Sequence, residues 1–329
     1  MSLGGTYLAR RVKVFLTSRK IIDNWLLSAF DYLRGKESIK IRVKDKEFNV
    51  SKWFYSDLVN MFYDGEIQGL SVESDKLVIR TSFQDVEVDE HVIRYDFKFL
   101  YEGLRRGWKY SNGVLEKNGV KFKYVSASVF EIFDNKVYEK VGVVTGEVVD
   151  IGANVGDSAI FFALKGAKKV VGVEPLPSAH ALALENIKLN GLEGKIVMLN
   201  AALGAKKGTL KVPCNYSTSA SGGFSITRSN SKGKCEVPII TLSDVLSEIS
   251  EPYLLKMDCE GCEFDVIIND YDHVRAFKKL IIEHHAKFTG ISYTLLLDKL
   301  AKDFQCLVTP GVPWAPKEDI GLLWCDRVD

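Results

Sequence analysis

The chain has 329 residues, with 44 lysines and arginines against 43 aspartates and glutamates. Its hydrophobic content of 46% and charged content of 26% are typical of a soluble globular protein. A net charge of +1 excludes a chain that is basic as a whole and binds polyanions, and no apolar run approaches the length of a membrane span. Six cysteines in this length do not indicate a disulfide scaffold, so we expect a cytoplasmic protein.

The first third of the chain is predicted to form a smaller α+β domain. Apolar residues recur at helical spacing over 20–34, which predicts a helix. Short alternating segments at 39–43, 47–50, 76–80 and 86–88 predict strands. We place this domain at 1–119 and expect it to recognise substrate or to mediate dimerisation, although its many aromatic residues also suit an ordinary small core.

The basic start of the chain raises the alternative of nucleic-acid binding. Residues 1–52 hold 12 lysines and arginines against 5 acidic residues. These basic residues are dispersed among apolar positions of the predicted helix rather than clustered, which favours a solvated face. We therefore do not expect a nucleic-acid partner.

The remainder, 120–329, alternates between strand and helix periods, which predicts a parallel sheet with helices on both faces. The expected strands lie at 147–151, 169–174, 195–200, 253–257, 279–283, 305–309 and 320–325, and the expected helices at 158–165, 178–190, 242–249, 263–268 and 292–303. Segments 209–212 and 235–240 interrupt the alternation as a hairpin. The Ser/Gly-rich stretch 215–225 between them is predicted to be either a lid or a plain surface loop.

A glycine loop follows the first strand of this domain in Val-Val-Asp-Ile-Gly-Ala-Asn-Val-Gly-Asp (148–157). Gly152 and Gly156 permit close backbone approach, and Glu174 ends the second strand, where an acid can bind both hydroxyls of a ribose. A dinucleotide site would place the middle glycine of Gly-x-Gly-x-x-Gly where Asn154 stands, and its pyrophosphate would be repelled by Asp150. S-adenosylmethionine carries a ribose and a cationic head without phosphate, so this pattern favours it over NAD.

Ligands of such sheets bind at the carboxyl ends of the strands, and this rule selects further residues. Asp150 and the glycine loop should hold the methionine part. Asn200, Ala201 and Ala202 end the third strand and should border the adenine. Asp258 ends the fourth strand and should face the methyl group.

Five motifs also occur in a fixed order along the chain. They are Asp-Ile-Gly-Ala-Asn-Val-Gly-Asp, Val-Glu-Pro, Glu-Asn-Ile-Lys-Leu-Asn-Gly, Asn-Ala-Ala-Leu-Gly and Leu-Lys-Met-Asp-Cys-Glu-Gly-Cys-Glu (255–263). In this order they resemble the FkbM family of S-adenosylmethionine-dependent methyltransferases over about 120–285. The resemblance implies a Rossmann-like, seven-stranded class I methyltransferase fold and O-methylation, often of sugar or polyketide hydroxyls. It also implies that Asp258, Glu260, Gly261 and Glu263 lie at the end of the fourth strand.

Methyl transfer to a hydroxyl needs a group that takes the hydroxyl proton. Asp258, Glu260 and His284 are our catalytic candidates because they follow strands four and five. Each has a structural alternative: Asp258 as a helix cap, Glu260 as a partner of a basic residue. His285 is expected to point to the opposite face from His284.

We do not expect a metal, although Mg²⁺ or Mn²⁺ could be held by Asp258, Glu283 and His284. Cys259 and Cys262 are read as small apolar residues in a turn rather than as a redox or zinc motif. Cys214 and Cys235 flank the 215–225 loop and could pair, which a cytoplasmic location argues against.

The leading hypothesis is an O-methyltransferase acting on a hydroxyl of a sugar, glycolipid or small metabolite. An RNA methyltransferase and a non-catalytic cofactor-binding module are the alternatives, and an NAD enzyme is disfavoured. The sequence leaves the acceptor open, and it allows a homodimer without indicating one.

Overall fold

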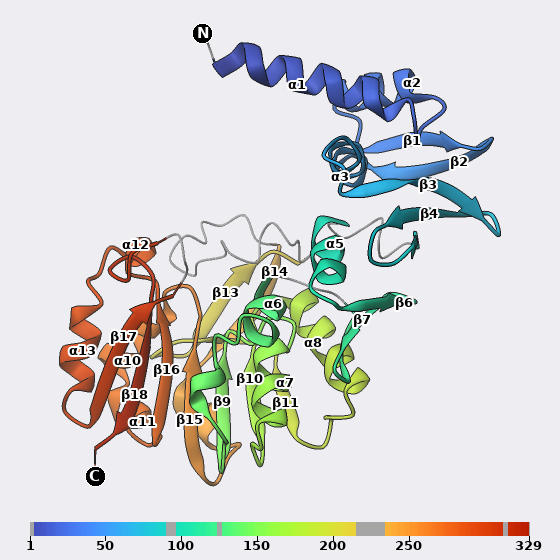
Figure 1. Ribbon diagram of the computed structural model, residues 1–329. Helices are drawn as coiled ribbons and strands as arrows, with labels where there is room; N and C mark the ends of the chain where they lie inside the picture. The colour runs from blue at the N-terminus through green and yellow to red at the C-terminus, as the bar shows by residue number, and fades with distance from the viewer. Residues whose placement is uncertain (1–2, 90–96, 124–126, 215–233, 312–314, 329) are drawn as a thin grey trace. The chain divides into compact units, whose positions relative to one another are not determined.

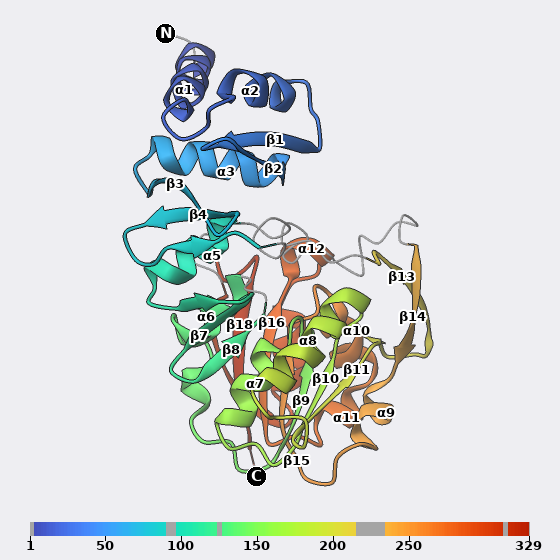
Figure 2. The ribbon, with the colours of Figure 1, turned by 90° about the vertical axis from the view of Figure 1, so that its right-hand side faces the viewer.

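A computed structural model of the chain describes residues 3–89, 97–123, 127–214, 234–311 and 315–328, with side chains of the first helix described from Leu8 onward. The chain divides into two compact units, Met1–Ala127 and Ser128–Asp329 (Figures 1 and 2). The predicted boundary at residue 119 lies a few residues before this division. No helix in these described ranges combines the length and the apolarity that a membrane crossing requires.

The described residues of the first unit form a small α+β domain with three separate sheets. Its helices are α1 (Leu3–Ser18), α2 (Trp25–Leu33), α3 (Lys52–Tyr63) and α5 (Phe97–Arg105). Its strands are β1 (Ser38–Val43), β2 (Lys46–Ser51), β3 (Ile67–Glu73), β4 (Lys76–Thr81), β5 (Val86–Glu87), β6 (Lys109–Ser111), β7 (Val114–Lys117) and β8 (Val120–Phe122). Strands β1 and β2 form an antiparallel hairpin, and β3-β4-β5 and β6-β7-β8 form two three-stranded sheets.

Helix α3 was not predicted, because its residues read as an aromatic run rather than as a periodic segment. Ser51 caps it by accepting a hydrogen bond from the Phe54 amide at 3.1 Å. Phe54 and Tyr55 are buried on its inner face, whereas Trp53 stays 69% exposed. Phe54 and Tyr55 therefore belong to the core of this unit, as the structural alternative predicted, whereas Trp53 does not.

The second unit is built on a seven-stranded sheet in the order β11-β10-β9-β15-β16-β18-β17 (Figure 1). All neighbours are parallel except β18, which runs antiparallel to β16 and β17. The strands are β9 (Glu147–Ile151), β10 (Val170–Val173), β11 (Ile196–Leu199), β15 (Pro252–Met257), β16 (Lys279–His284), β17 (Phe304–Pro310) and β18 (Gly321–Arg327). This order and the single reversed strand confirm the predicted class I methyltransferase architecture.

Helices cover both faces of this sheet (Figure 2). Helices α7 (Asp157–Leu164) and α8 (Pro177–Leu189) contact β9, β10 and β11. The other face carries α9 (Leu242–Leu246), α10 (Cys262–Asn269), α11 (Tyr271–Val274) and α13 (Thr294–Leu300), whose apolar side chains join the main core. Short helical segments lie before β9, at α6 (Ala127–Phe133) and Glu139–Val141, and after β16, at α12 (Ala286–Thr289).

A separate three-stranded sheet follows the third strand of the large one. It consists of β12 (Ala202–Leu203), β14 (Cys235–Ile240) and β13 (Gly208–Val212), with β13 and β14 paired antiparallel as the predicted hairpin. The predicted lid or surface loop at 215–225 lies outside the described residues.

All six cysteines are paired in disulfides. Cys214 bonds to Cys235, Cys259 to Cys262, and Cys306 to Cys325. Our interpretation of Cys259 and Cys262 as small apolar residues in a turn was therefore wrong, as was the argument against the Cys214–Cys235 pair. Disulfides persist mainly in oxidising compartments and in intracellular proteins of hyperthermophiles, so this pairing speaks against an ordinary reducing cytoplasm.

Candidate active site

The glycine loop after β9 is held against the end of the fourth strand. Gly152 has φ +76°, and a Cβ at this position would lie 1.8 Å from the carbonyl oxygen of Asp258. Only glycine tolerates both that dihedral and that approach. The sequence attributed this glycine to ligand approach, whereas the structure shows contact between two strand ends. The loop then turns at Asn154, with φ 47°, and enters α7 at Gly156.

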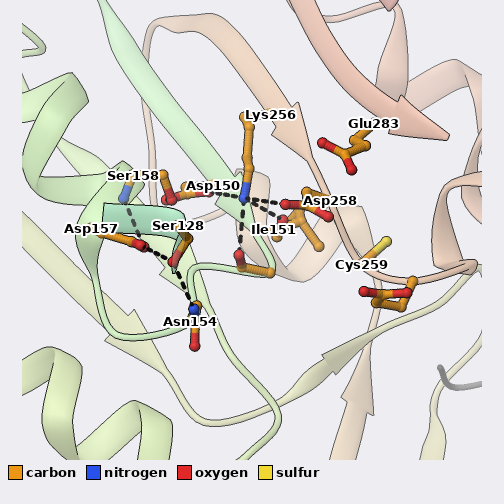
Figure 3. A network of polar contacts seen from close by, with 12 residues as sticks. Ser128, Asp150, Ile151, Asn154, Asp157, Ser158, Lys256, Asp258, Cys259 and Glu283 are labelled. Carbon is orange, nitrogen blue, oxygen red and sulfur yellow. Dashed lines mark hydrogen bonds and ion pairs between the residues drawn. The ribbon is translucent and has the colours of Figure 1, made fainter. Parts of the chain in front are cut away.

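Asp150 is fully buried, and its charge is paired within the protein. Lys256 of β15 lies with its Nζ 3.1 Å from Oδ1 of Asp150, and the side chain of this lysine is 2% exposed. The Ser158 hydroxyl donates to Oδ2 of Asp150 at 2.6 Å. The charge of Asp150 thus has a partner in Lys256, as Figure 3 shows, and its expected contact with a cationic head stays a prediction.

Lys256 ties the strand ends together and was missed by the sequence reasoning. Its Nζ also donates to the carbonyl oxygen of Gly152 at 2.9 Å and lies 3.9 Å from Oδ2 of Asp258. Burial opposes its charged form, but the carboxylates of Asp150 and Asp258 outweigh this effect and raise the lysine pKa. The sequence did contain a signal for this role, because Lys256 lies between the apolar Leu255 and Met257 in a predicted strand.

Helix α6 adds polar residues beside the glycine loop. The side-chain amide of Asn154 donates to the Ser128 hydroxyl at 3.2 Å, and Ser128 in turn donates to the Asp157 carboxylate (Figure 3). Burial raises the pKa of Asp157 to about 6, although the hydrogen bond from Ser128 acts to lower it. On the same helix, burial and the carboxylate of Asp258 raise the pKa of Glu131. The sequence reasoning named neither Ser128 nor Glu131.

Glu174 lies directly after β10, where the sequence placed it. Its two carboxylate oxygens accept backbone hydrogen bonds from Asn154 at 2.9 Å and from Leu176 at 2.8 Å. Each oxygen keeps a second lone pair for another donor. Burial raises the Glu174 pKa to about 7, although both backbone hydrogen bonds act in the opposite direction.

The third strand end is placed beside Glu174. The Asn200 side-chain amide donates to the Glu174 carbonyl oxygen at 2.9 Å and to that of Pro175 at 3.2 Å. Ala201 and Ala202 are buried, and Ala202 opens the short strand β12. Of the three residues expected to border an adenine, Asn200 is the one that is partly exposed.

The ends of β15 and β16 bring three carboxylates around one imidazole. Nε2 of His285 lies 3.8 Å from Asp258, 3.7 Å from Glu260 and 3.8 Å from Glu283. Nδ1 of the same ring lies 3.1 Å from Oε1 of the fully buried Glu263. We refer to Asp258, Glu260, Glu283 and His285 as the strand-end cluster.

His284, a predicted catalytic base, does not belong to this cluster. It is fully buried and stacks on Tyr293, with ring centroids 4.8 Å apart and planes 7° apart. The two histidines do point to opposite faces, as expected for successive residues, but it is His285 that points toward the cluster. The metal set considered from the sequence changes in the same way, with His285 in place of His284.

The buried charges of the strand-end cluster shift one another's pKa values. Burial alone would lower the pKa of His285, but its hydrogen bond with Glu263 and the nearby carboxylates raise it to about 10. Burial, followed by the carboxylate of Asp258, raises the pKa of Glu283 to about 8. Burial lowers the pKa of His284, on the other face of the strand.

Comparison with known families agrees with this architecture. Residues 150–302 match the model of the methyltransferase FkbM domain. A curated protein N5-glutamine methyltransferase of Methanocaldococcus jannaschii is 38% identical over 82 residues, which is 24% of this chain and 41% of that protein. The chain therefore spans less than half the length of this relative.

Two solved structures show similar topology at low identity. The methyltransferase FkbM of Methylobacillus flagellatus KT is 16% identical with a TM-score of 0.40, covering 72% of this chain and 55% of that one. A Clostridium thermocellum protein named an rRNA methylase is 11% identical with a TM-score of 0.41, covering 60% and 96%. At these values neither structure bears on the reaction. The family match, with the sheet order above, identifies 150–302 as a methyltransferase domain of the FkbM family.

Proposed function

We propose that the chain is an S-adenosylmethionine-dependent methyltransferase that methylates a hydroxyl of a sugar, glycolipid or other small metabolite. One observation carries the proposal: the strand-end cluster adjoins the loop that should hold the cofactor. The Asp258 carbonyl touches the Gly152 position, and the Asp258 side chain is part of the cluster. Cofactor-binding and proton-accepting groups thus meet at one edge of the sheet.

The residues at the ends of β9 and β10 fit this cofactor. Glu174 has a free lone pair on each oxygen for the two ribose hydroxyls, with its backbone donors fixing the carboxylate. The pairing of Asp150 with Lys256 holds the loop rather than the ligand. The pyrophosphate of NAD would need a glycine-rich loop at the start of the helix, and Asn154 replaces one of those glycines. We therefore continue to disfavour NAD.

When bound, S-adenosylmethionine supplies a methyl group on a positively charged sulfur. In the reaction the S–CH₃ bond breaks and an O–CH₃ bond forms, which leaves a neutral thioether. The acceptor hydroxyl loses its proton to a carboxylate, and Asp258 and Glu260, with side chains 33% and 20% exposed, are accessible for this role. Glu263 contacts His285 and so positions the ring beneath these carboxylates.

The name of the archaeal relative raises a second candidate, the side-chain amide of a protein glutamine. The lone pair of an amide nitrogen is delocalised into the carbonyl group. A site that methylates an amide therefore needs hydrogen-bonding groups that hold the amide plane more than it needs a base. Several carboxylates gathered on a histidine suit a hydroxyl better, because a hydroxyl must give up a proton. We therefore rank the hydroxyl acceptor first, with a glutamine peptide and RNA as comparison substrates.

Transfer of labelled methyl groups tests the proposal. The full chain is incubated with methyl-labelled S-adenosylmethionine and panels of sugars, glycolipids, glutamine peptides and RNA. We expect labelled methyl ethers in a hydroxylated panel, and a loss of about 10²- to 10⁴-fold in Asp258→Asn or Glu260→Gln. Asp272→Asn, with a side chain 88% exposed, serves as the matched carboxylate control. Methylation of glutamine or RNA alone would contradict the hydroxyl acceptor.

A further inference from the structure

The strand-end cluster has the donor arrangement of a metal site. Donor atoms of Asp258, Glu283 and His285 all lie within 4.8 Å of one another. The three distances from Nε2 of His285 to carboxylate oxygens are 3.7–3.8 Å, which is too long for hydrogen bonds. Donors this close to one another need only small side-chain shifts to bind a single cation at about 2.0–2.3 Å.

The orientation of His285 is an independent observation that points to a ligand. The ring is 3% exposed, and its Nδ1 lies 3.1 Å from the fully buried Glu263. The backbone amide of His285 also donates to the same Glu263 oxygen at 2.8 Å. Donation of Nδ1–H to a carboxylate directs Nε2 away from Glu263 and into the cluster, where a cation would bind in place of the Nε2 proton. Carboxylate–histidine pairs of this kind orient the ring of metal-binding histidines.

We propose that Asp258, Glu283 and His285 bind one divalent cation, with Glu263 holding the histidine from behind. Two carboxylates and one imidazole form a mixed oxygen and nitrogen set, which suits Mn²⁺ better than the all-oxygen preference of Mg²⁺ or Ca²⁺. Glu260, on the same side of the ring, is then the carboxylate left to take the acceptor's proton.

This site narrows the substrate class, a step that rests on the proposed methyl transfer. A cation at the end of β15 and β16 attracts oxygen ligands from the acceptor. An acceptor with two neighbouring hydroxyls, as in many sugars, could offer both oxygens and so be oriented relative to the methyl donor.

Direct Mn²⁺ binding tests the site without any turnover. Loss of the electron paramagnetic resonance signal of free Mn²⁺ is followed as the full chain is added. We expect about one saturable site, weakened more than about 100-fold by Glu283→Gln or His285→Gln and about 10- to 100-fold by Glu263→Gln. Asp258→Asn replaces a ligand that is partly exposed and should be tolerated by the fold. It is the variant to measure if Glu283→Gln or His285→Gln does not fold. His273→Gln and Asp272→Asn are matched controls and should bind Mn²⁺ normally.

A second titration separates the cation from the cofactor. Each protein is titrated with S-adenosylmethionine in the presence of a chelator. Saturable Mn²⁺ binding that depends on Glu283 and His285 supports the site. Cofactor binding without any saturable Mn²⁺ binding overturns the cation and leaves the methyltransferase proposal standing. Mn²⁺ binding that survives in all ligand variants also overturns this assignment, whereas loss of cofactor binding alone refutes only the proposed function.

Discussion

Replacing Lys256 by methionine should destabilise the second unit severely. The lysine Nζ lies 3.1 Å from Asp150 and donates to the Gly152 carbonyl at 2.9 Å. Methionine keeps the length of the side chain but removes its charge, which leaves the buried Asp150 carboxylate with the Ser158 hydroxyl as a partner. Breaking a buried ion pair from one side costs roughly 3–5 kcal/mol. For a unit of this size, that corresponds to a fall in Tm of about 6–20 °C.

Chemical unfolding of four proteins isolates the ion pair. Lys256→Met and Asp150→Asn are measured singly and together, and each free energy of unfolding is compared with that of the wild type. The double variant should be less destabilised than the sum of the single variants, because neither charge is then left alone. Lys207→Met removes a lysine that is 71% exposed and should leave stability nearly unchanged. A Lys256→Met protein within about 1 kcal/mol of the wild type would refute the reasoning.

Three further predictions concern the cofactor loop and the disulfides. Cofactor affinity should rise as pH increases through about 7, because the proposed contact of Glu174 with the ribose hydroxyls requires an ionised carboxylate. Glu174→Gln should flatten this dependence in calorimetric titrations. Gly152→Ala should lower the free energy of unfolding by about 2–5 kcal/mol, through backbone strain and overlap with Asp258. Gly191→Ala is the control and should cost far less, because φ there is +66° and a Cβ meets nothing within 4 Å. Equal losses in urea unfolding would contradict the close approach at Gly152. The Cys306→Ser, Cys325→Ser double variant should lose about 3 kcal/mol under non-reducing conditions, and an unchanged unfolding midpoint would argue against that bond.

The order of elements in the second unit was predictable because periodicity and glycine punctuation are local properties. Strands alternating with helices allow few topologies, and the carboxyl-end rule then selects the site from the sequence. Glu174, Asp258 and Glu260 were named on this basis, and the structure places them at the ends of β10 and β15. In the first unit, α1 and α3 were not predicted. The buried residues of α3, such as Phe54, Leu58 and Met61, do follow helical spacing, but the segment was read as an aromatic run.

What was missed depends on contacts between distant segments. Burial of Lys256 beside Asp150 involves two strands about a hundred residues apart, and a lone lysine in an apolar run does not reveal its partner. The choice of His284 over His285 depended on the phase of one strand, where a shift by one residue exchanges the two faces. Pairing of all six cysteines required Cα distances that spacing along the chain does not provide.

Titration of the purified chain with S-adenosylmethionine, S-adenosylhomocysteine and NAD is the most decisive test of the proposed cofactor. We predict saturable calorimetric binding of both methionine-based ligands and no binding of NAD. Glu174→Ala should weaken binding because the ribose loses its carboxylate partner. Absence of binding by either methionine-based ligand would contradict the claim that this domain is a working methyltransferase.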